Sequence, residues 1–143
     1  MKFSRAACAC TALRKASRAV TRLYDEAMAD TGMSVIQFSI LCHLGQHGPL
    51  PLMELADLLV MERTTLYRAL NPLRRRNWVL LSDGTARAKS ASLAAGGTKA
   101  LAAATGAWEA AQEGLLERLG LEEWMRLESS LTAIVTLATG HQA

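Results

Sequence analysis

Hydrophobic residues recur every three or four positions along most of the chain, and this spacing is typical of helices with one apolar face. The first such stretch runs from about Cys8 to Asp30. Thr31-Gly32 ends it, because glycine readily takes the left-handed conformation that closes a helix. A second stretch starts at Ser34, whose side chain suits a helix N-cap, and stops at Gly48-Pro49. The pattern therefore predicts two helices before residue 50.

Two further helices follow, separated by a tight turn. Pro51 suits the first turn of a short helix from Leu52 to Leu59, and a longer helix is expected from about Glu62 to Arg76. Pro72 lies inside this longer helix, where it removes a backbone hydrogen bond near the last turn. Together the two helices and their turn form a helix-turn-helix.

The pattern after residue 77 is that of a β-hairpin. Trp78 to Leu81 is a β-prone stretch, Ser82 to Thr85 is a turn signal, and Lys89 to Leu93 is the expected return strand. Gly96-Gly97 precede a long helical stretch, which Gly120 separates from a final helix. We therefore expect a mainly α protein with a small β-hairpin wing: four helices, one hairpin and two helices.

Composition narrows the class of protein. The chain has 143 residues, of which 50% are hydrophobic and 20% are charged. It can bury a core, and charged residues interrupt every stretch long enough to span a membrane. Three cysteines are too few for a disulfide framework, and the N-terminal apolar patch is too short for a secretory signal. We expect a cytoplasmic protein without a membrane partner.

The net charge of +3 conceals an uneven distribution along the chain. Residues 60–99 contain eight Lys or Arg against two acids, a net charge of +6. Residues 100–143 contain two Arg against six Glu, a net charge of −4, and the first 59 residues contribute only +1. A basic middle segment favours an anionic partner such as nucleic acid.

The longer helix of the helix-turn-helix carries different side chains on its two faces. Leu66, Leu70 and Leu73 form an apolar face that can pack on the preceding helix. The opposite face combines arginines with short polar side chains, which are the groups that read base edges in a major groove. The expected DNA contacts are Arg63, Thr64, Thr65, Tyr67, Arg68 and Arg74, with Arg87 and Lys89 of the hairpin at an adjacent backbone or minor groove. The alternative is that these cations are only the solvated face of an amphipathic helix.

The stretch LADLLVMERTTLYR at residues 55–68, followed by Arg74-Arg75-Arg76 and Val79, resembles the helix-turn-helix of the MarR family. The preceding two-helix unit, the wing turn at Asp83-Gly84 and the two closing helices extend this resemblance over nearly the whole chain. It implies a MarR-like winged helix-turn-helix in a single domain, 1–143. Residues 31–95 would form the DNA-binding lobe, and residues 1–30 and 96–143 the dimerisation helices.

The same resemblance implies a function. It indicates a homodimeric, sequence-specific transcriptional regulator, usually a repressor, on double-stranded DNA at a pseudo-palindromic operator with half-sites ~34 Å apart. The last two helices also carry more apolar residues than one small core requires, which fits helices that intertwine with a partner. The alternative is that Trp108 and Trp124 are ordinary core residues within one chain.

Three positions depart from the family pattern. Val60 stands where a small residue or glycine is usual, so the turn lacks a relaxed left-handed glycine. Asn77 replaces the glycine that closes the recognition helix, and asparagine tolerates that conformation. Thr85 takes a place that is often arginine, so Arg87 is expected to carry the minor-groove contact.

One candidate signal that releases DNA is oxidation. Residues 10–24 are similar to the first helix of organic-hydroperoxide-sensing members, and the resemblance makes Cys10 a candidate redox sensor beside Tyr24 of the partner subunit. Those members use tyrosines at the positions of Arg14 and Val35, so only Tyr24 is kept. The alternative is that Cys10 is a small interface residue.

The other candidate signal is a small aromatic or phenolic effector, in a pocket lined by Arg14, Arg18 and His43 between the dimerisation helices and the DNA-binding lobe. No cofactor or metal is expected, because Cys8-Ala9-Cys10 has no second ligand cluster. No paired carboxylates, phosphate loop or Ser/His/Asp set stands out, so we do not expect an enzyme. The remaining alternative is a winged-helix interaction module without DNA-regulatory activity.

Overall fold

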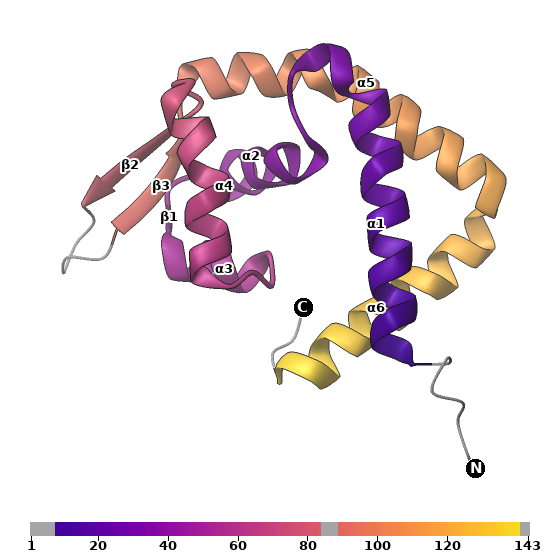
Figure 1. Cartoon of the computed structure of the whole chain (residues 1–143). Helices are drawn as coiled ribbons and strands as arrows, with labels where there is room; N and C mark the ends of the chain where they lie inside the picture. The colour runs from indigo at the N-terminus through magenta and orange to yellow at the C-terminus, as the bar shows by residue number, and fades with distance from the viewer. Residues whose placement is uncertain (1–7, 84–88, 141–143) are drawn as a thin grey trace.

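The computed structural model describes residues 8–83 and 89–140, and it is mainly helical with one small sheet (Figure 1). In chain order the elements are α1 (Ala9–Ala27), the 3-10 helix η2 (Ala29–Thr31), α2 (Val35–His47), β1 (Leu50–Pro51), α3 (Leu52–Leu58), α4 (Arg63–Arg75), β2 (Val79–Asp83), β3 (Lys89–Leu93), α5 (Ala95–Leu119) and α6 (Leu121–Thr139). Helices α2, α3 and α4 gather with the sheet in one lobe, and α5 runs from this lobe past α1 to α6 (Figure 1). None of the helices within the described ranges is long and apolar enough to cross a bilayer.

Local chemistry sets the helix boundaries. The Ser34 hydroxyl accepts a hydrogen bond from the Gln37 N–H, and the Gln37 side chain accepts one from the Ser34 N–H, so α2 begins with a complete capping box. Gly32 ends η2 with φ 65°, and Gly120 separates α5 from α6 with φ 86°. The predicted cap at Ser34 and the predicted breaks at Gly32 and Gly120 are confirmed.

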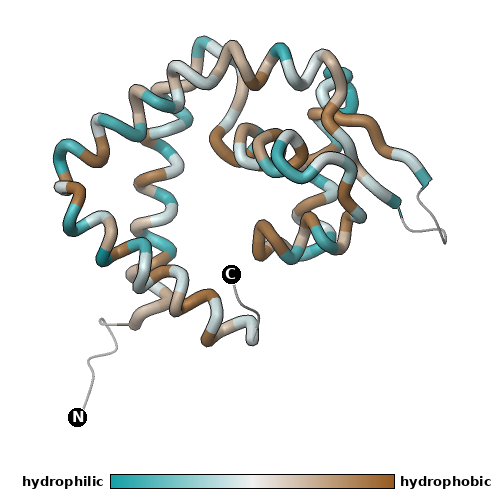
Figure 2. The backbone as a smooth tube through the Cα atoms, turned by 180° about the vertical axis from the view of Figure 1, so that it is seen from behind, coloured by the Kyte–Doolittle hydropathy of each residue, from teal (hydrophilic) through white to brown (hydrophobic). Residues whose placement is uncertain are grey.

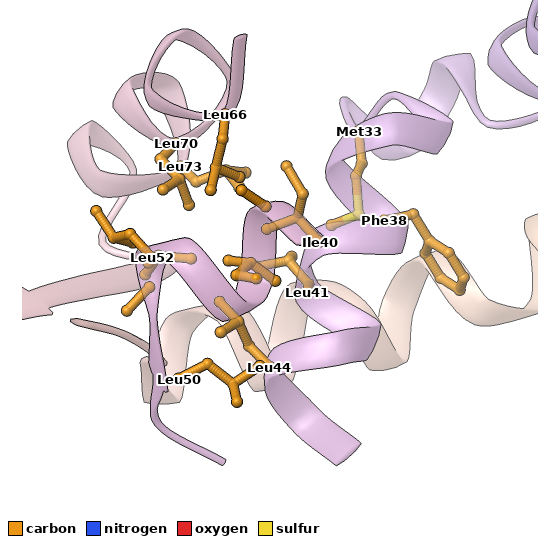
Figure 3. Close-up of a cluster of buried hydrophobic side chains, with 14 of the residues drawn as sticks. Met33, Phe38, Ile40, Leu41, Leu44, Leu50, Leu52, Leu66, Leu70 and Leu73 are labelled. Carbon is orange, nitrogen blue, oxygen red and sulfur yellow. The ribbon is translucent and has the colours of Figure 1, made fainter. Parts of the chain in front are cut away.

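The hydrophobic core lies within the lobe (Figure 3). Most of its members come from α2, α3, α4 and the adjoining strands, and Met28, Met33 and Ala104 of α5 complete it. Those labelled in Figure 3 are Met33, Phe38, Ile40, Leu41, Leu44, Leu50, Leu52, Leu66, Leu70 and Leu73. Full burial of each such side chain stabilises the fold by roughly 1.5–3 kcal/mol. Phe38 also stacks on Trp108 with ring centroids 5.4 Å apart, which ties α5 to the lobe.

The wing is the antiparallel pair of β2 and β3, as the sequence predicts, with Leu81 opposite Ala91. Strand β2 continues through Ser82 and Asp83, which were expected in the turn, because both residues pair with β3. A third strand, β1, pairs with the outer edge of β3 and was not predicted. It has only two residues, Leu50 and Pro51, and its partners are some 40 residues later in the chain. Such a strand has no local hydrophobic pattern, because only the long-range pairing defines it.

The start of α5 corrects one sequence prediction. The helix begins at Ala95, so Gly96 and Gly97 lie in its first turn and do not precede it. Gly97 is buried, and a Cβ at this position would be 2.1 Å from the carbonyl oxygen of Trp78. The lack of a side chain therefore lets α5 cross close over the start of the wing, and this contact outweighs the low helix propensity of glycine.

Candidate nucleic-acid interface

Helix α4 presents two chemically different faces, as the sequence predicts. Leu66, Leu70 and Leu73 are fully buried in the lobe. The other predicted contacts of this helix lie outside that face: Arg63, Thr64, Thr65, Arg68 and Arg74 are exposed, and Tyr67 is half-buried against the core. At the helical spacing of α4, Thr64, Thr65 and Arg68 lie on the face opposite the leucines, whereas Arg63 and Arg74 lie at the side of the leucine face. The exposed arginine and threonine side chains of α4 are thus open to a large partner.

The turn between α3 and α4 is held by backbone hydrogen bonds. The Met61 N–H donates to the Ala56 carbonyl at 2.8 Å, and the Val60 N–H donates to the Asp57 carbonyl at 3.1 Å. Val60 takes the left-handed conformation with φ 51°, although it has a branched Cβ. The turn therefore keeps the geometry that a glycine would give, and valine imposes strain on it.

The end of α4 is closed at Asn77, as the sequence predicts. Asn77 has φ 54°, and the Trp78 N–H donates to the Leu73 carbonyl at 2.9 Å. Of the three consecutive arginines, Arg76 has a structural role that the sequence did not reveal. Its guanidinium donates to the Gly32 carbonyl at 2.6 Å and lies 4.8 Å from the centre of the Trp78 ring.

Of the two cations predicted in the wing, Lys89 and Arg87, only Lys89 lies within the described residues. Lys89 is exposed at the start of β3, opposite Asp83. The Ser82 and Ser90 hydroxyls lie 2.9 Å apart across the strands and join the exposed ends of the hairpin. Arg87 lies outside the described residues, so its contact stays a prediction.

The redox candidates are separated along α1. Cys10 is exposed, whereas Tyr24 is buried and its hydroxyl donates a hydrogen bond to the Gln112 side chain in α5 of the same chain. Burial raises the pKa of Tyr24, which keeps the hydroxyl protonated. A second exposed thiol, Cys8, has a pKa lowered by hydrogen bonds from the backbone and side chain of Thr11. Sequence reasoning did not single out Cys8, because this effect depends on the turn that begins α1.

The three predicted effector-binding residues do not share one hollow. Arg14 and Arg18 line a shallow depression on α1 together with Leu13 and Ser17. His43 is not among the residues of this depression; its Nδ1 donates to the Ser39 carbonyl at 2.8 Å, which fixes its tautomer. Within the described ranges, no group of three or more His, Cys, Asp or Glu side chains is placed to hold a metal ion.

A helix-turn-helix followed by an antiparallel wing, with a basic exposed face on the second helix, defines the class of winged-helix proteins. The family model of the MarR family matches residues 33–83, which span α2 to β2. The chain belongs to the MarR family, since it is also 32% identical to a solved transcriptional regulator over nearly the full length of both chains.

Three solved structures show the extent of the similarity. The 32% identical relative is the M. tuberculosis transcriptional regulator MosR in complex with DNA; 93% of this chain and 97% of that chain are covered, with a TM-score of 0.84. A probable transcriptional regulator from Pseudomonas aeruginosa is 24% identical, with 92% and 99% covered and a TM-score of 0.80. A mutant MarR from E. coli complexed with operator DNA is 20% identical, with 87% and 91% covered and a TM-score of 0.77. The last two share the fold alone. No curated protein matches the sequence.

Proposed function

We propose that this protein is a sequence-specific transcriptional regulator that binds double-stranded DNA as a homodimer. The observation that carries the proposal is the exposed arginine and threonine face of α4, on a lobe whose segment 60–99 has a net charge of +6. The similarity to MosR, solved in complex with DNA, supports it. In this proposal residues 31–95 bind DNA, and residues 1–30 and 96–143 form the dimer.

The residues have distinct roles in this mechanism. Helix α4 enters the major groove, where Arg63 and Arg68 donate pairs of hydrogen bonds to guanine and Thr64 and Thr65 contact base edges. Tyr67 and Arg74 contact phosphates beside the groove, and Lys89 and Arg87 of the wing reach the neighbouring backbone or minor groove. Two copies related by a two-fold axis then read a pseudo-palindromic operator with half-sites ~34 Å apart.

Release from the operator completes the proposed repressor cycle. One route is oxidation of an exposed thiol to a sulfenic acid by an organic hydroperoxide, which is reduced to the alcohol. This oxidation, or binding of a small aromatic effector, would favour a dimer whose two α4 helices are spaced wrongly for the operator. The exposure of Cys10 and the lowered pKa of its neighbour Cys8 support the first route. Three free cysteines also fit a reducing cytoplasm, and we propose no catalytic activity.

The test is selection of binding sites from a pool of random duplexes, followed by titration of the selected duplex. We expect the Arg63→Ala/Arg68→Ala variant to lose at least about tenfold in affinity, because each bidentate contact to guanine is worth ~1–3 kcal/mol. Affinity of the parent should fall steeply with salt as phosphate contacts release counterions. The control is Arg118→Ala, which removes an exposed cation from α5 and should bind like the parent.

Two results would contradict the proposal. Selection that enriches no sequence would favour the interaction-module alternative. Equal binding by the parent and the α4 variant would show that α4 is not the reading helix.

A further inference from the structure

The lobe is joined to the helices outside it by two connections along the chain. The first is residues 28–34 between α1 and α2, and the second is the start of α5, which follows β3. Seen from behind, the lobe with its wing lies on one side of the molecule, and the outer helices (α1, the outer half of α5, and α6) lie on the other (Figure 2). The orientation of α4 relative to the outer helices therefore depends on how these two connections are held.

Both connections contact residues 76–78, the segment that closes α4 and leads into the wing. On one side, the Arg76 guanidinium donates a hydrogen bond to the Gly32 carbonyl at 2.6 Å. On the other, the Trp78 carbonyl accepts a hydrogen bond from the Ala94 N–H at 2.9 Å, immediately before α5. The Arg76 guanidinium also lies 4.8 Å from the centre of the Trp78 ring, so one side chain joins the two connections.

The Gly32 carbonyl belongs to a turn that is itself held by the outer helices. The Gly32 N–H donates to the Ala29 carbonyl at 3.1 Å, and η2 packs on α1 and α5. Asp25, near the end of α1, accepts a hydrogen bond from the Val35 N–H at 2.7 Å and so ties α1 to the start of α2. The hydrogen bond from Arg76 to Gly32 therefore connects the end of α4 to the outer helices.

The chemistry of this contact favours arginine over lysine. A guanidinium is planar, so it can stack on an indole ring and donate hydrogen bonds from its edge at the same time. A lysine ammonium is a compact point charge, which suits a phosphate but does not provide this pair of contacts. Within residues 8–83 and 89–140, the side chain of the neighbouring Arg75 makes no hydrogen bond or ion pair. Arg75 is therefore a matched control for Arg76.

We propose that Arg76 is a positioning residue that fixes the angle between α4 and the outer helices and so selects the half-site spacing that the dimer reads. This inference rests on the proposed function, because it requires two reading helices on one operator. Thr64, at the reading end of α4, is about 18 Å from Arg76 along the helix, so a rotation of ~10° about residues 76–78 moves it by about 3 Å. This displacement is close to the rise of one base pair, ~3.4 Å.

The test compares duplexes that differ only in the distance between half-sites. One base pair is inserted into or removed from the centre of the operator that the parent selects, and the resulting loss of affinity is the spacing penalty. For the parent we expect a penalty of at least about tenfold, because the second α4 loses its contacts to base edges. In the Arg76→Ala variant the penalty should shrink at least about threefold, and affinity for the selected operator should fall by a similar factor, because fewer dimers hold the competent spacing. Arg76 is exposed, so its replacement removes no core packing.

Two further variants separate positioning from charge. Arg76→Lys keeps the charge and should show the reduced spacing penalty of Arg76→Ala. Arg75→Ala removes a neighbouring exposed cation and should keep the spacing penalty of the parent, whatever its total affinity. Two outcomes would overturn the proposal: a spacing penalty of Arg76→Ala equal to that of the parent, or full rescue by lysine, which would assign Arg76 to a phosphate.

A measurement without DNA separates failure of this proposal from failure of the proposed function. Spin labels at the exposed positions Thr64→Cys of α4 and Arg118→Cys of α5 report the distance between the reading end and the outer helices, with the three native cysteines replaced by serine and the labelled chain diluted with unlabelled chain. Arg76→Ala should broaden the distance distribution by about 3 Å, whereas Arg75→Ala should leave it unchanged. Equal widths in all three proteins would contradict the role of Arg76 even where DNA binding is intact. A parent that selects no DNA sequence, with the broadening present in Arg76→Ala, would contradict only the proposed function.

Discussion

Val60 is the residue at which backbone strain and the candidate DNA-binding surface come together. It stands in the turn immediately before α4 and holds a left-handed conformation that costs an L-residue ~1–2 kcal/mol. Its side chain is 56% exposed, so burial of its methyl groups offsets little of this cost. The strain persists because the surrounding structure fixes the backbone of the turn. Val60 and Met61 donate hydrogen bonds back to α3, and Leu66 is packed in the core.

Replacement of Val60 by glycine should stabilise the protein. We expect the Val60→Gly variant to raise the free energy of unfolding by about 1 kcal/mol, because glycine adopts the left-handed conformation without the clash of a branched Cβ. Urea unfolding measures the change. The matched control is Asn77→Gly at φ 54°, where the parent residue already tolerates this conformation and the effect should be smaller. A less stable Val60→Gly variant would show that the turn is not strained.

At the scale of elements, α5 decides how the wing sits on the lobe. Its first turn crosses over the start of β2, and the Trp78 carbonyl that faces Gly97 also accepts a hydrogen bond from the Ala94 N–H at 2.9 Å. This carbonyl is held by that bond and has little freedom to move. Further along α5, Ala104 is buried in the core of the lobe and Trp108 stacks on Phe38. Helix α5 therefore connects the reading surface to the helices outside the lobe.

Two glycines of the same helix should respond oppositely to alanine. In the Gly97→Ala variant the new Cβ would meet the Trp78 carbonyl oxygen at 2.1 Å and Leu93 at 2.8 Å, so we expect a loss of at least about 2 kcal/mol in unfolding free energy. In the Gly106→Ala variant nothing lies within 4 Å, and the higher helix propensity of alanine should add ~0.8–1 kcal/mol. Thermal and urea unfolding of both variants check this pair. Equal effects at the two sites would mean that the close crossing at Gly97 does not exist.

At the scale of the whole molecule, the buried hydrophobic core and much of the exposed hydrophobic surface lie in different parts of the chain: the core in the lobe, the exposed surface on the helices outside it. Buried hydrophobic residues concentrate in the lobe, α1 buries only Tyr24, and α6 buries none among the described residues. Most of the stability of a helix in a protein comes from tertiary packing of its apolar face, and the apolar side chains of α6 are at most half-buried in one chain. We therefore expect the second copy of the proposed homodimer to contribute to the stability of α6.

The stability of the chain should consequently depend on its concentration. A hundredfold rise in concentration should stabilise the folded dimer by about 2.7 kcal/mol and raise Tm by roughly 5 °C. Calorimetry at two concentrations measures the shift. A parent Tm that is independent of concentration would argue against an obligate dimer.

Local signals in the sequence account for most of the fold but for only part of the site. Ser34 and Gly32 mark helix ends through hydrogen bonds and dihedral angles within a few residues, so they could be predicted from neighbours alone. The buried leucines of α4 follow from their spacing, and so does its exposed face. The two-residue strand β1, the role of Arg76 and the position of Gly97 could not be predicted, because each depends on a residue far away in the chain.

The sequence by itself determined the order of elements, the winged helix-turn-helix and the basic segment that points to nucleic acid. The reason is that periodicity, capping and charge depend on residues close together in the chain. Only the tertiary structure decided which charged side chains of the chain have a partner. It shows Arg76 held by Gly32 and Trp78, and within residues 8–83 and 89–140 it shows no ion pair to Arg14, Arg18 or Arg22 of α1 or to the glutamates of α5. The physical reason is that the partner of a charge is set by how distant helices pack.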